Sequence, residues 1–309
     1  MPSNVFLWLS ERRQLFEFIK SNGLARKLAS RFVAGETIES AIEAARILNK
    51  DGTRVSLDSL GESVASRDET IEARDEVIQI LDAIAATGVD GNVSLKFTQL
   101  GLDIDSALCK DNMSQILGHA KELDTFVRID MEGSDYTGRT LEMFEDLHET
   151  FGNVTGVVIQ SYLRRSADDI ERLIARGARV RLVKGAYAEP PELAFQDMKD
   201  VRSSYVDLMK RLLDDGNYPG IATHDERLIE QAIRYVGDNG ISTERFEFQM
   251  LFGVRRDLQK RLRRQGFNVR IYVPFGCNWY PYMMRRLAER STNVAFMVAS
   301  VLKEMVSRK

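Results

Sequence analysis

Short apolar runs rich in β-branched residues alternate with longer amphipathic stretches along most of this chain. The short runs predict eight strands, at Arg54–Leu57, Asn92–Phe97, Phe126–Met131, Gly156–Ser161, Arg179–Val183, Gly220–Thr223, Arg245–Leu251 and Asn268–Val273. Between them, apolar positions recur with the helical period, in Asp68–Thr87, Met113–Glu122, Thr140–Phe151, Ala167–Arg176, Asp197–Asp214, Glu226–Asp238 and Arg255–Gln265.

The alternation of strands and helices predicts the fold class. Strands that are each followed by a helix favour a parallel sheet, and eight such units can close into a (β/α)8 barrel. No low-complexity linker divides the chain, and residues 4–50 also show helical patterning. We therefore expect an α/β protein with a TIM-type barrel, in which residues 1–50 form an N-terminal helical segment. Residues 51–309 would form the catalytic barrel and a C-terminal helix.

Composition and charge narrow the functional classes. With 44% hydrophobic and 29% charged residues, the chain can form a folded core rather than a disordered one. A net charge of −3 gives no reason to expect nucleic-acid binding. Three histidines and two cysteines argue against a metal centre and a disulfide framework. No transmembrane run or secretory signal is recognisable, which predicts a cytoplasmic protein.

Polar residues gather where the predicted strands end. In a (β/α)8 barrel the active site forms at these carboxyl ends. Lys96, Asp130 and Arg181 interrupt otherwise apolar runs, and burying each charge unpaired would cost several kcal/mol. We therefore expect them to pair with a ligand or with one another. Other polar residues at these ends are Asp58, Glu62, Glu132, Gln160, Lys184, Tyr187, Thr223, His224, Asp225, Gln249 and Tyr272.

A basic helix is predicted after the last strand, at Pro281–Arg290. One of its faces carries four polar side chains at helical spacing, namely Tyr282, Arg285, Arg286 and Glu289. Two adjacent guanidinium groups can hold a carboxylate through paired hydrogen bonds. The pattern alone is equally compatible with a solvated basic helix.

Two common nucleotide-binding motifs are absent from the sequence. It contains neither GxGxxG nor GxxxxGK[ST], so it encodes neither a Rossmann unit nor a P-loop. Lys96 or Lys184 could instead form a Schiff base, as in class I aldolases. Spacing alone does not decide between that chemistry and a bound cofactor.

Taken together, eight ordered segments resemble the proline dehydrogenase family, specifically its monofunctional bacterial type. They are SLDSLGE (56–62), SLKFTQLGLDID (94–105), RIDMEGS (128–134), RLVKGAY (181–187), ATHD (222–225), FEFQML (246–251), RIYVPFG (270–276) and YMMRRLAER (282–290). The resemblance implies a distorted (β/α)8 barrel that binds FAD without a Rossmann domain. It implies oxidation of L-proline to Δ1-pyrroline-5-carboxylate, the first step of proline catabolism, with hydride transfer from C5 to flavin N5.

The resemblance also assigns roles to individual residues. Arg181, Lys96 and Asp130 would be catalytic, with Arg181 near flavin N5. Substrate contacts would come from Lys96, Arg285, Arg286, Tyr187, Tyr272, Tyr282, Leu251 and Glu62, where Glu62 pairs with Arg285. Cofactor contacts would come from Gln160, Arg181, Val183, Lys184, Gly185, Ala186, Thr223, His224, Asp225, Gln249 and Glu289. At Asp225, many members of the family have asparagine instead.

The resemblance further implies a membrane quinone as electron acceptor. This leaves open a peripheral contact with the inner face of the cell membrane, through apolar runs such as Val294–Leu302 and Phe6–Leu9. It also leaves open an interaction with a Δ1-pyrroline-5-carboxylate dehydrogenase. Two other functions remain as alternatives, namely a class I aldolase-like barrel and a non-catalytic barrel that binds an amino acid.

Overall fold

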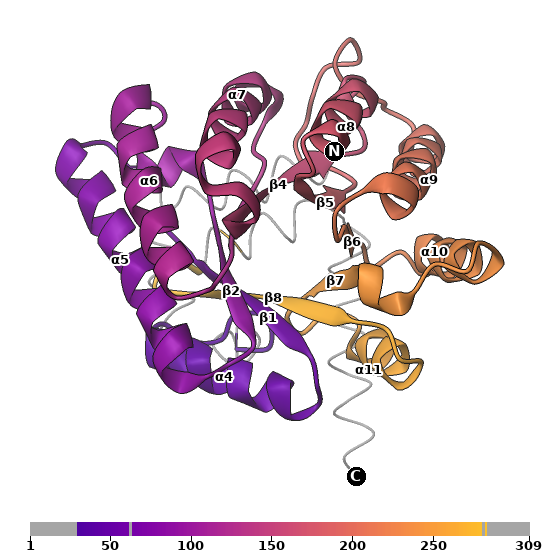
Figure 1. Cartoon of the computed structure of the whole chain (residues 1–309), viewed down its shortest axis with the longest axis horizontal. Helices are drawn as coiled ribbons and strands as arrows, with labels where there is room; N and C mark the ends of the chain where they lie inside the picture. The colour runs from indigo at the N-terminus through magenta and orange to yellow at the C-terminus, as the bar shows by residue number, and fades with distance from the viewer. Residues whose placement is uncertain (1–29, 62–63, 280–281, 283–309) are drawn as a thin grey trace, which may run out of the picture.

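The computed structural model describes residues 30–61, 64–279 and 282. Its centre is a closed barrel of eight parallel strands in sequence order (Figure 1). Its strands are β1 (Arg54–Ser59), β2 (Gly91–Leu95), β3 (Val127–Ile129), β4 (Thr155–Gln160), β5 (Arg179–Val183), β6 (Gly220–Ala222), β7 (Glu247–Leu251) and β8 (Val269–Phe275). The barrel closes between β1 and β8, where the pairing runs from Arg54–Arg270 to Ser59–Phe275.

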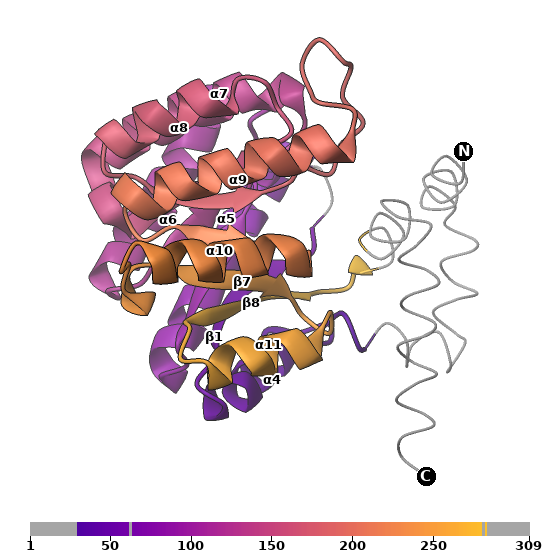
Figure 2. The same ribbon diagram turned by 90° about the vertical axis from the view of Figure 1, so that its right-hand side faces the viewer.

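Helices surround the barrel on its outside (Figures 1 and 2). They are α4 (Ile38–Lys50), α5 (Arg67–Thr87), α6 (Ser106–Glu122), α7 (Ser134–Phe151), α8 (Ser166–Ala175), α9 (Met198–Asp215), α10 (Glu226–Asp238) and α11 (Arg256–Arg264). Short 3-10 turns η1 (Phe97–Leu100), η2 (Gly152–Val154) and η3 (Thr243–Arg245) complete the connections. The predicted barrel, with all eight strands within a few residues of their expected positions, is confirmed.

Two helices begin earlier than the apolar period predicted. Helix α6 starts at Ser106 because the side chain of Asp105 accepts hydrogen bonds from the backbone N–H groups of Ala107 and Leu108. Helix α7 starts at Ser134, directly after Gly133, which has no side chain to cap it. The carboxylate that caps α7 comes from a distant loop, described below.

Helix α4 occupies the place in the ring between α11 and α5 (Figure 1). It packs on β1 and β8 and buries Ala41, Ile42 and Ala45 in the main core. Just before it, the Ala34 N–H donates to the carbonyl of Pro274 at 2.9 Å. The helical patterning of residues 38–50 is thus confirmed, and this helix shares the core of the barrel. Within the rest of the expected helical segment, residues 30–37 form turns and irregular chain and not a helix, and residues 1–29 lie outside the described residues.

Apolar side chains fill the space between strands and helices, whereas the barrel interior is polar. Phe144, Leu117 and Ile229 belong to the outer, apolar layer. The interior instead buries polar side chains from six strands, which are Ser56, Ser94, Arg128, Arg181, Glu247, Gln249 and Arg270. Buried polar groups require partners, so the arrangement of charge in this interior decides what the barrel can bind.

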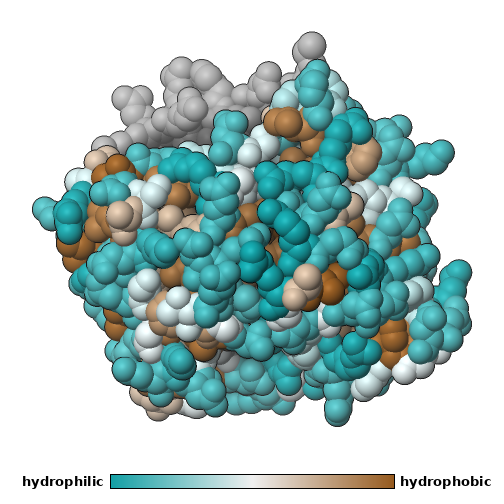
Figure 3. Space-filling view, turned by 45° about the horizontal axis from the view of Figure 1, so that its top comes forward, coloured by the Kyte–Doolittle hydropathy of each residue, from teal (hydrophilic) through white to brown (hydrophobic). Residues whose placement is uncertain are grey.

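The outer surface is mainly hydrophilic on the face shown in Figure 3, where hydrophobic residues form only small groups. Within the described ranges, no helix is both long and apolar enough to cross a membrane.

Candidate active site

A buried ion pair lies at the carboxyl ends of the strands. Arg181, on β5, is 5% exposed and donates from Nη1 to Asp130 Oδ1, which follows β3, at 2.7 Å. Its Nη2 donates to Ser94 Oγ at 3.1 Å and to Ser56 Oγ at 3.4 Å. The hydroxyl of Tyr272, on β8, donates to the other oxygen of Asp130 at 2.8 Å. The prediction that these charges pair with one another is therefore confirmed for Arg181 and Asp130.

A second charge pair lies beside the first. Lys96 Nζ, just after β2, is 3.5 Å from the buried carboxylate of Asp58 on β1. Burial lowers the pKa of Lys96, but the carboxylates of Asp58, Asp130 and Glu132 outweigh it and raise that pKa above its usual value. Lys96 is therefore held as a cation at the mouth of the barrel.

Asp58 contributes to this site, although sequence reasoning gave it no role. Its carboxyl is buried, and Oδ1 has no hydrogen-bond partner among the described residues. A signal was present in the sequence, since Ser56 and Asp58, like Ser94 and Lys96, are two residues apart along a strand. Residues at that spacing point to the same face, so two pairs of polar side chains entering one interior could have been recognised.

A third cluster of charged side chains forms where the loops after β5 and β6 meet. Lys184 Nζ contacts Asp225 Oδ2 at 2.6 Å, and Arg202 Nε, on α9, contacts the same oxygen at 2.9 Å. Burial opposes ionisation of Asp225, but the two cations lower its pKa to about 2. Asp225 is therefore a carboxylate neutralised by two neighbours, and Arg202 is a residue that sequence analysis missed.

The remaining predicted cofactor residues lie on strands β4 to β7 and in the loops after β5 and β6, and the Gln249 amide reaches toward the amino-terminal end of the barrel. Buried Gln160 donates to the carbonyl of Glu132 at 2.8 Å, and Gln249 donates to Glu247 Oε1 at 2.6 Å. His224 Nε2 accepts from the backbone N–H of Leu251 at 2.8 Å. Val183 ends β5, and Thr223 caps the turn after β6 by accepting from the Asp225 N–H.

Gly185 and Ala186 continue the chain beyond β5. Gly185 has a φ of +112°, and a Cβ there would collide with the ring of Tyr162. Only glycine fits this close approach of the backbone to the Tyr162 ring.

Several predicted residues lie outside the described residues, namely Glu62, Arg285, Arg286 and Glu289. Tyr282 is described and is buried, whereas Tyr187 is 43% exposed on the loop after β5. The structure thus brings Lys96, Asp130, Arg181 and Tyr272 together.

The loop that carries Tyr187 is tied to the start of α7. Glu189 Oε1 accepts from the Ser134 backbone N–H at 2.8 Å, and Oε2 accepts from the Ser134 hydroxyl. Tyr162 donates to the same carboxylate at 3.5 Å. A carboxylate is favoured at a helix N-terminus because the first N–H groups there have no partner within the helix. Glu189 therefore caps α7 from a distance of 55 residues along the chain.

We expect Glu189→Ala to loosen residues 185–197. Loss of a helix cap costs about 1 kcal/mol, so backbone amides of this loop and of the first turn of α7 should exchange with deuterium faster than in the wild type. Glu192→Ala, on the same loop but exposed, is the matched control and should leave exchange unchanged. Equal exchange in the two variants would show that Glu189 does not hold the loop.

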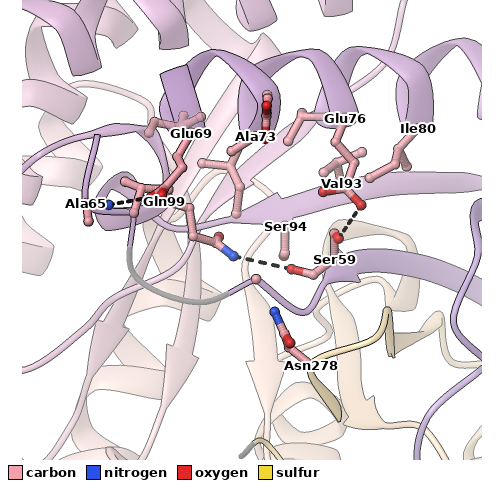
Figure 4. A pocket seen from close by; sticks show the side chains of 16 residues that line it. Ser59, Ala65, Glu69, Ala73, Glu76, Ile80, Val93, Ser94, Gln99 and Asn278 are labelled. Atoms are coloured by element: carbon pink, nitrogen blue, oxygen red, sulfur yellow. Dashed lines mark hydrogen bonds between the residues drawn. The ribbon is translucent and has the colours of Figure 1, made fainter. Parts of the chain in front are cut away.

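A separate cavity of about 450 Å³ lies between α5 and strands β1 and β2 (Figure 4). Glu69 and Glu76 of α5 line one side, and Ser59 Oγ donates to Glu76 Oε1 at 2.7 Å. Gln99 closes another side by donating to the Ser59 carbonyl at 3.3 Å. Of the predicted site residues that the structure describes, none lines this cavity.

Comparison with known proteins supplies the family. The family model described as proline dehydrogenase matches residues 41–299. Proline dehydrogenase 1 of Bacillus subtilis subsp. natto is 40% identical over 304 residues, which cover 98% of this chain and all of that protein. Proline dehydrogenase of Deinococcus radiodurans is 42% identical over 301 residues, covering 96% of each chain.

A solved structure agrees in fold. Proline utilization A from Bdellovibrio bacteriovorus, inactivated by N-propargylglycine, superposes with a TM-score of 0.80 and 27% identity. The match covers 85% of this chain and 32% of that longer one. With the barrel, the ordered motifs and full-length relatives in agreement, the chain belongs to the proline dehydrogenase family.

Proposed function

We propose that this chain oxidises L-proline to Δ1-pyrroline-5-carboxylate with FAD as its flavin and a quinone as the final electron acceptor. The observation that carries the proposal is the near-complete match to proline dehydrogenases. The buried Arg181–Asp130 pair at the carboxyl ends of the strands supports it, because this is where a (β/α)8 barrel places its chemistry.

The residues at this end fit a flavin. Arg181 Nε is a buried donor without an acceptor among the described residues, so a polar group of a ligand can satisfy it. Gly185 follows β5 with a φ of +112° at the same end of the barrel, where it brings backbone without a side chain. We propose that the flavin is held by Gln160, Arg181, Val183, Lys184, Gly185, Ala186, Thr223, His224, Asp225, Gln249 and Glu289. When bound, the flavin accepts the hydride that leaves proline C5.

Proline would be oriented through its carboxylate. We assign this contact to Lys96, Arg285 and Arg286, of which Lys96 is seen here as a cation held by Asp58. The proline ring would be surrounded by Tyr187, Leu251, Tyr272 and Tyr282, with Asp130 beside them. Glu62 would pair with Arg285. A carboxylate fixed by several cations aims C5, and such positioning contributes much of the rate in an oriented reaction.

The charges around the substrate also set its protonation. Oxidation removes a hydride from C5 and a proton from nitrogen, and the nitrogen lone pair forms the new C=N bond. The amine must therefore be neutral when it reacts. Cations close to an amine lower its pKa and carboxylates raise it, so the reactive form is favoured where Lys96 and Arg181 outweigh Asp58 and Asp130 at the proline nitrogen. Arg181 also lies ready to stabilise negative charge that develops during the reaction.

The aldolase alternative conflicts with the electrostatics. A lysine that forms a Schiff base needs a lowered pKa, whereas neighbouring carboxylates raise the pKa of Lys96. Lys184 is bound to Asp225 at 2.6 Å, which also favours its cationic form. Family membership further argues against an aldolase and against a non-catalytic amino-acid-binding barrel.

The electron acceptor and cellular location belong to the same proposal. A quinone acceptor calls for peripheral contact at the cytoplasmic face of the membrane. The apolar runs considered for it, Val294–Leu302 and Phe6–Leu9, lie outside the described residues. Some relatives are bifunctional proteins, such as that of Escherichia coli, which is 29% identical over 317 residues. A separate Δ1-pyrroline-5-carboxylate dehydrogenase would act on the product of this chain.

The deciding experiment is an absorbance spectrum of the purified protein before and after anaerobic addition of L-proline. We expect a flavin spectrum that bleaches with proline, and FAD rather than FMN after the flavin is released. A flavin that stays oxidised would indicate that the substrate is an amine other than proline. A colourless protein that cannot be reconstituted with FAD would refute the proposal.

A pH profile tests the role given to Asp58. We expect Asp58→Asn to lower the pKa of Lys96, because the closest carboxylate is lost. Lys96 would then lose its charge at lower pH, and kcat/KM for proline would fall at a lower pH on the alkaline side than in the wild type. If the alkaline limb of the pH profile of kcat/KM does not shift, Asp58 does not influence the substrate site through Lys96.

A further inference from the structure

The amino-terminal end of the barrel, opposite the active site, collects four arginines. They are Arg54, Arg128, Arg179 and Arg270, called here the basal arginine cluster. Gly156 in β4 makes room for it, since a Cβ there would come within 2.6 Å of Arg128 Nη1. Side chains from four different strands thus converge where the proposed reaction has no use for them.

Carboxylates balance only half of this cluster. Glu247 is 2.6 Å from Arg270 Nε and 3.8 Å from Arg54 Nη1. Asp90 lies 3.3 Å from Arg54 Nε. In the part of the chain that the structure describes, Arg128 and Arg179 have no carboxylate within ion-pairing distance. Two positive charges therefore remain uncompensated at the base of the barrel.

Aromatic rings hold these two unpaired arginines in place. The guanidinium carbon of Arg128 is 4.7 Å from the centre of the Phe126 ring, and that of Arg179 is 4.4 Å from it. Arg179 also lies 4.9 Å from the centre of the Tyr218 ring. Such contacts with ring faces stabilise a cation and fix the plane of its guanidinium.

Donors of both arginines remain unused. Arg128 Nη1 donates to the carbonyls of Val157 at 3.1 Å and Arg179 at 2.5 Å, but its Nε has no acceptor among the described residues. Arg128 is 2% exposed, so this is a buried cation with an N–H that the described chain does not satisfy. Within the same described ranges, the Nε of Arg179 has no acceptor either. Burial lowers the pKa of both groups, as expected for cations that lack a counter-charge.

We propose that the basal arginine cluster binds a small inorganic oxyanion such as phosphate, with Arg179 as the principal donor. A planar guanidinium offers paired N–H groups that match two oxygens of an oxyanion. Arg179, Tyr218 and Arg54 are partly exposed, so this side of the cluster meets solvent. The bound anion supplies the missing negative charge and stabilises the folded chain, because it binds the native state alone.

Titration of the FAD-loaded protein with inorganic phosphate tests this site. Binding is measured by calorimetry and by the shift in Tm, with chloride at the same ionic strength as reference. We expect a saturable rise in Tm with phosphate that chloride does not reproduce. In Arg179→Gln the Kd for phosphate should be at least about tenfold weaker, a loss of about 1.4 kcal/mol.

Arg245→Gln is the matched control, because Arg245 is exposed at the same end of the barrel and has no carboxylate within ion-pairing distance in the described chain. It should bind phosphate as the wild type does. If Arg179→Gln does not fold, Arg54→Gln takes its place, since Arg54 lies at the rim of the same cluster and should also weaken binding.

Three results would overturn the proposal. One is a wild-type protein whose response to phosphate equals that to chloride. Another is unchanged binding in the folded variant. The third is phosphate that competes with proline, since this would place the anion at the opposite end, among Lys96 and its neighbours. The first two results come from phosphate binding alone and do not depend on whether proline is the substrate. The third requires measurable turnover of proline.

Discussion

Lys96→Met should lower kcat/KM for L-proline by about 30- to 5,000-fold, because truncating one partner of a buried charge pair costs about 2–5 kcal/mol. Methionine keeps most of the length and volume of the side chain but removes the charge. The loss should appear mainly as weaker binding of proline and of unreactive carboxylate analogues. The flavin spectrum should stay unchanged, since Lys96 is not among the residues proposed to hold the cofactor.

The control for this variant is Lys110→Met. Lys110 is exposed and forms a 2.8 Å ion pair with Asp146 on the outside of the barrel, where such pairs contribute little. We expect its kinetic constants to match those of the wild type. A loss below about tenfold in Lys96→Met would mean that Lys96 serves the interior of the barrel and not the substrate.

Asp130→Ala should destabilise the protein by about 3–5 kcal/mol, the cost of leaving a buried charge without its partner. Among the described residues, the hydrogen-bond acceptors left to Arg181 would be the hydroxyls of Ser56 and Ser94. The Tyr272 hydroxyl would lose its acceptor as well. Asp130→Asn should fall between wild type and alanine, because the amide oxygen still accepts from Tyr272 while the charge is gone.

Urea denaturation of the FAD-loaded proteins measures this effect. Asp103→Ala removes a comparable partner at the surface, where Asp103 contacts Arg139 at 3.2 Å, and should cost less than about 1 kcal/mol. Equal losses in the two alanine variants would contradict the assignment of the Arg181–Asp130 pair as a buried, strongly coupled pair.

Local patterns were sufficient to predict the barrel, but they could not place the partners of its charges. A short run rich in β-branched residues between two amphipathic helical segments predicts each strand, so β1 to β8 could be identified one by one. The start of α7 could not, because Gly133 gives no capping signal and the cap is Glu189, far along the chain. Capping from a distant loop depends on the tertiary fold.

In the candidate site, too, local patterns predicted which residues are important but not which residues they contact. Arg181 and Asp130 lie in apolar runs, so the sequence predicts that each needs a partner. It does not predict that they pair with each other, because this depends on β3 and β5 lying in one barrel. Arg202 gave no signal at all, since a charged residue on an amphipathic helix ordinarily faces solvent. Its contact with Asp225 depends on how α9 packs beside the loop after β6.

The place of α4 has a consequence for the order in which the chain matures on the ribosome. Among the described elements this helix is made first, yet it rests on β8, the last described strand, and Gly276 donates a hydrogen bond to the carbonyl of Gly35 just before it. Until synthesis reaches that strand, the apolar face of Ala41, Ile42 and Ala45 lacks much of its cover. Contacts between such distant parts of a sequence form slowly. We therefore expect nascent chains that end before residue 269 to be captured by chaperones through this face, and release to follow completion of the final strand.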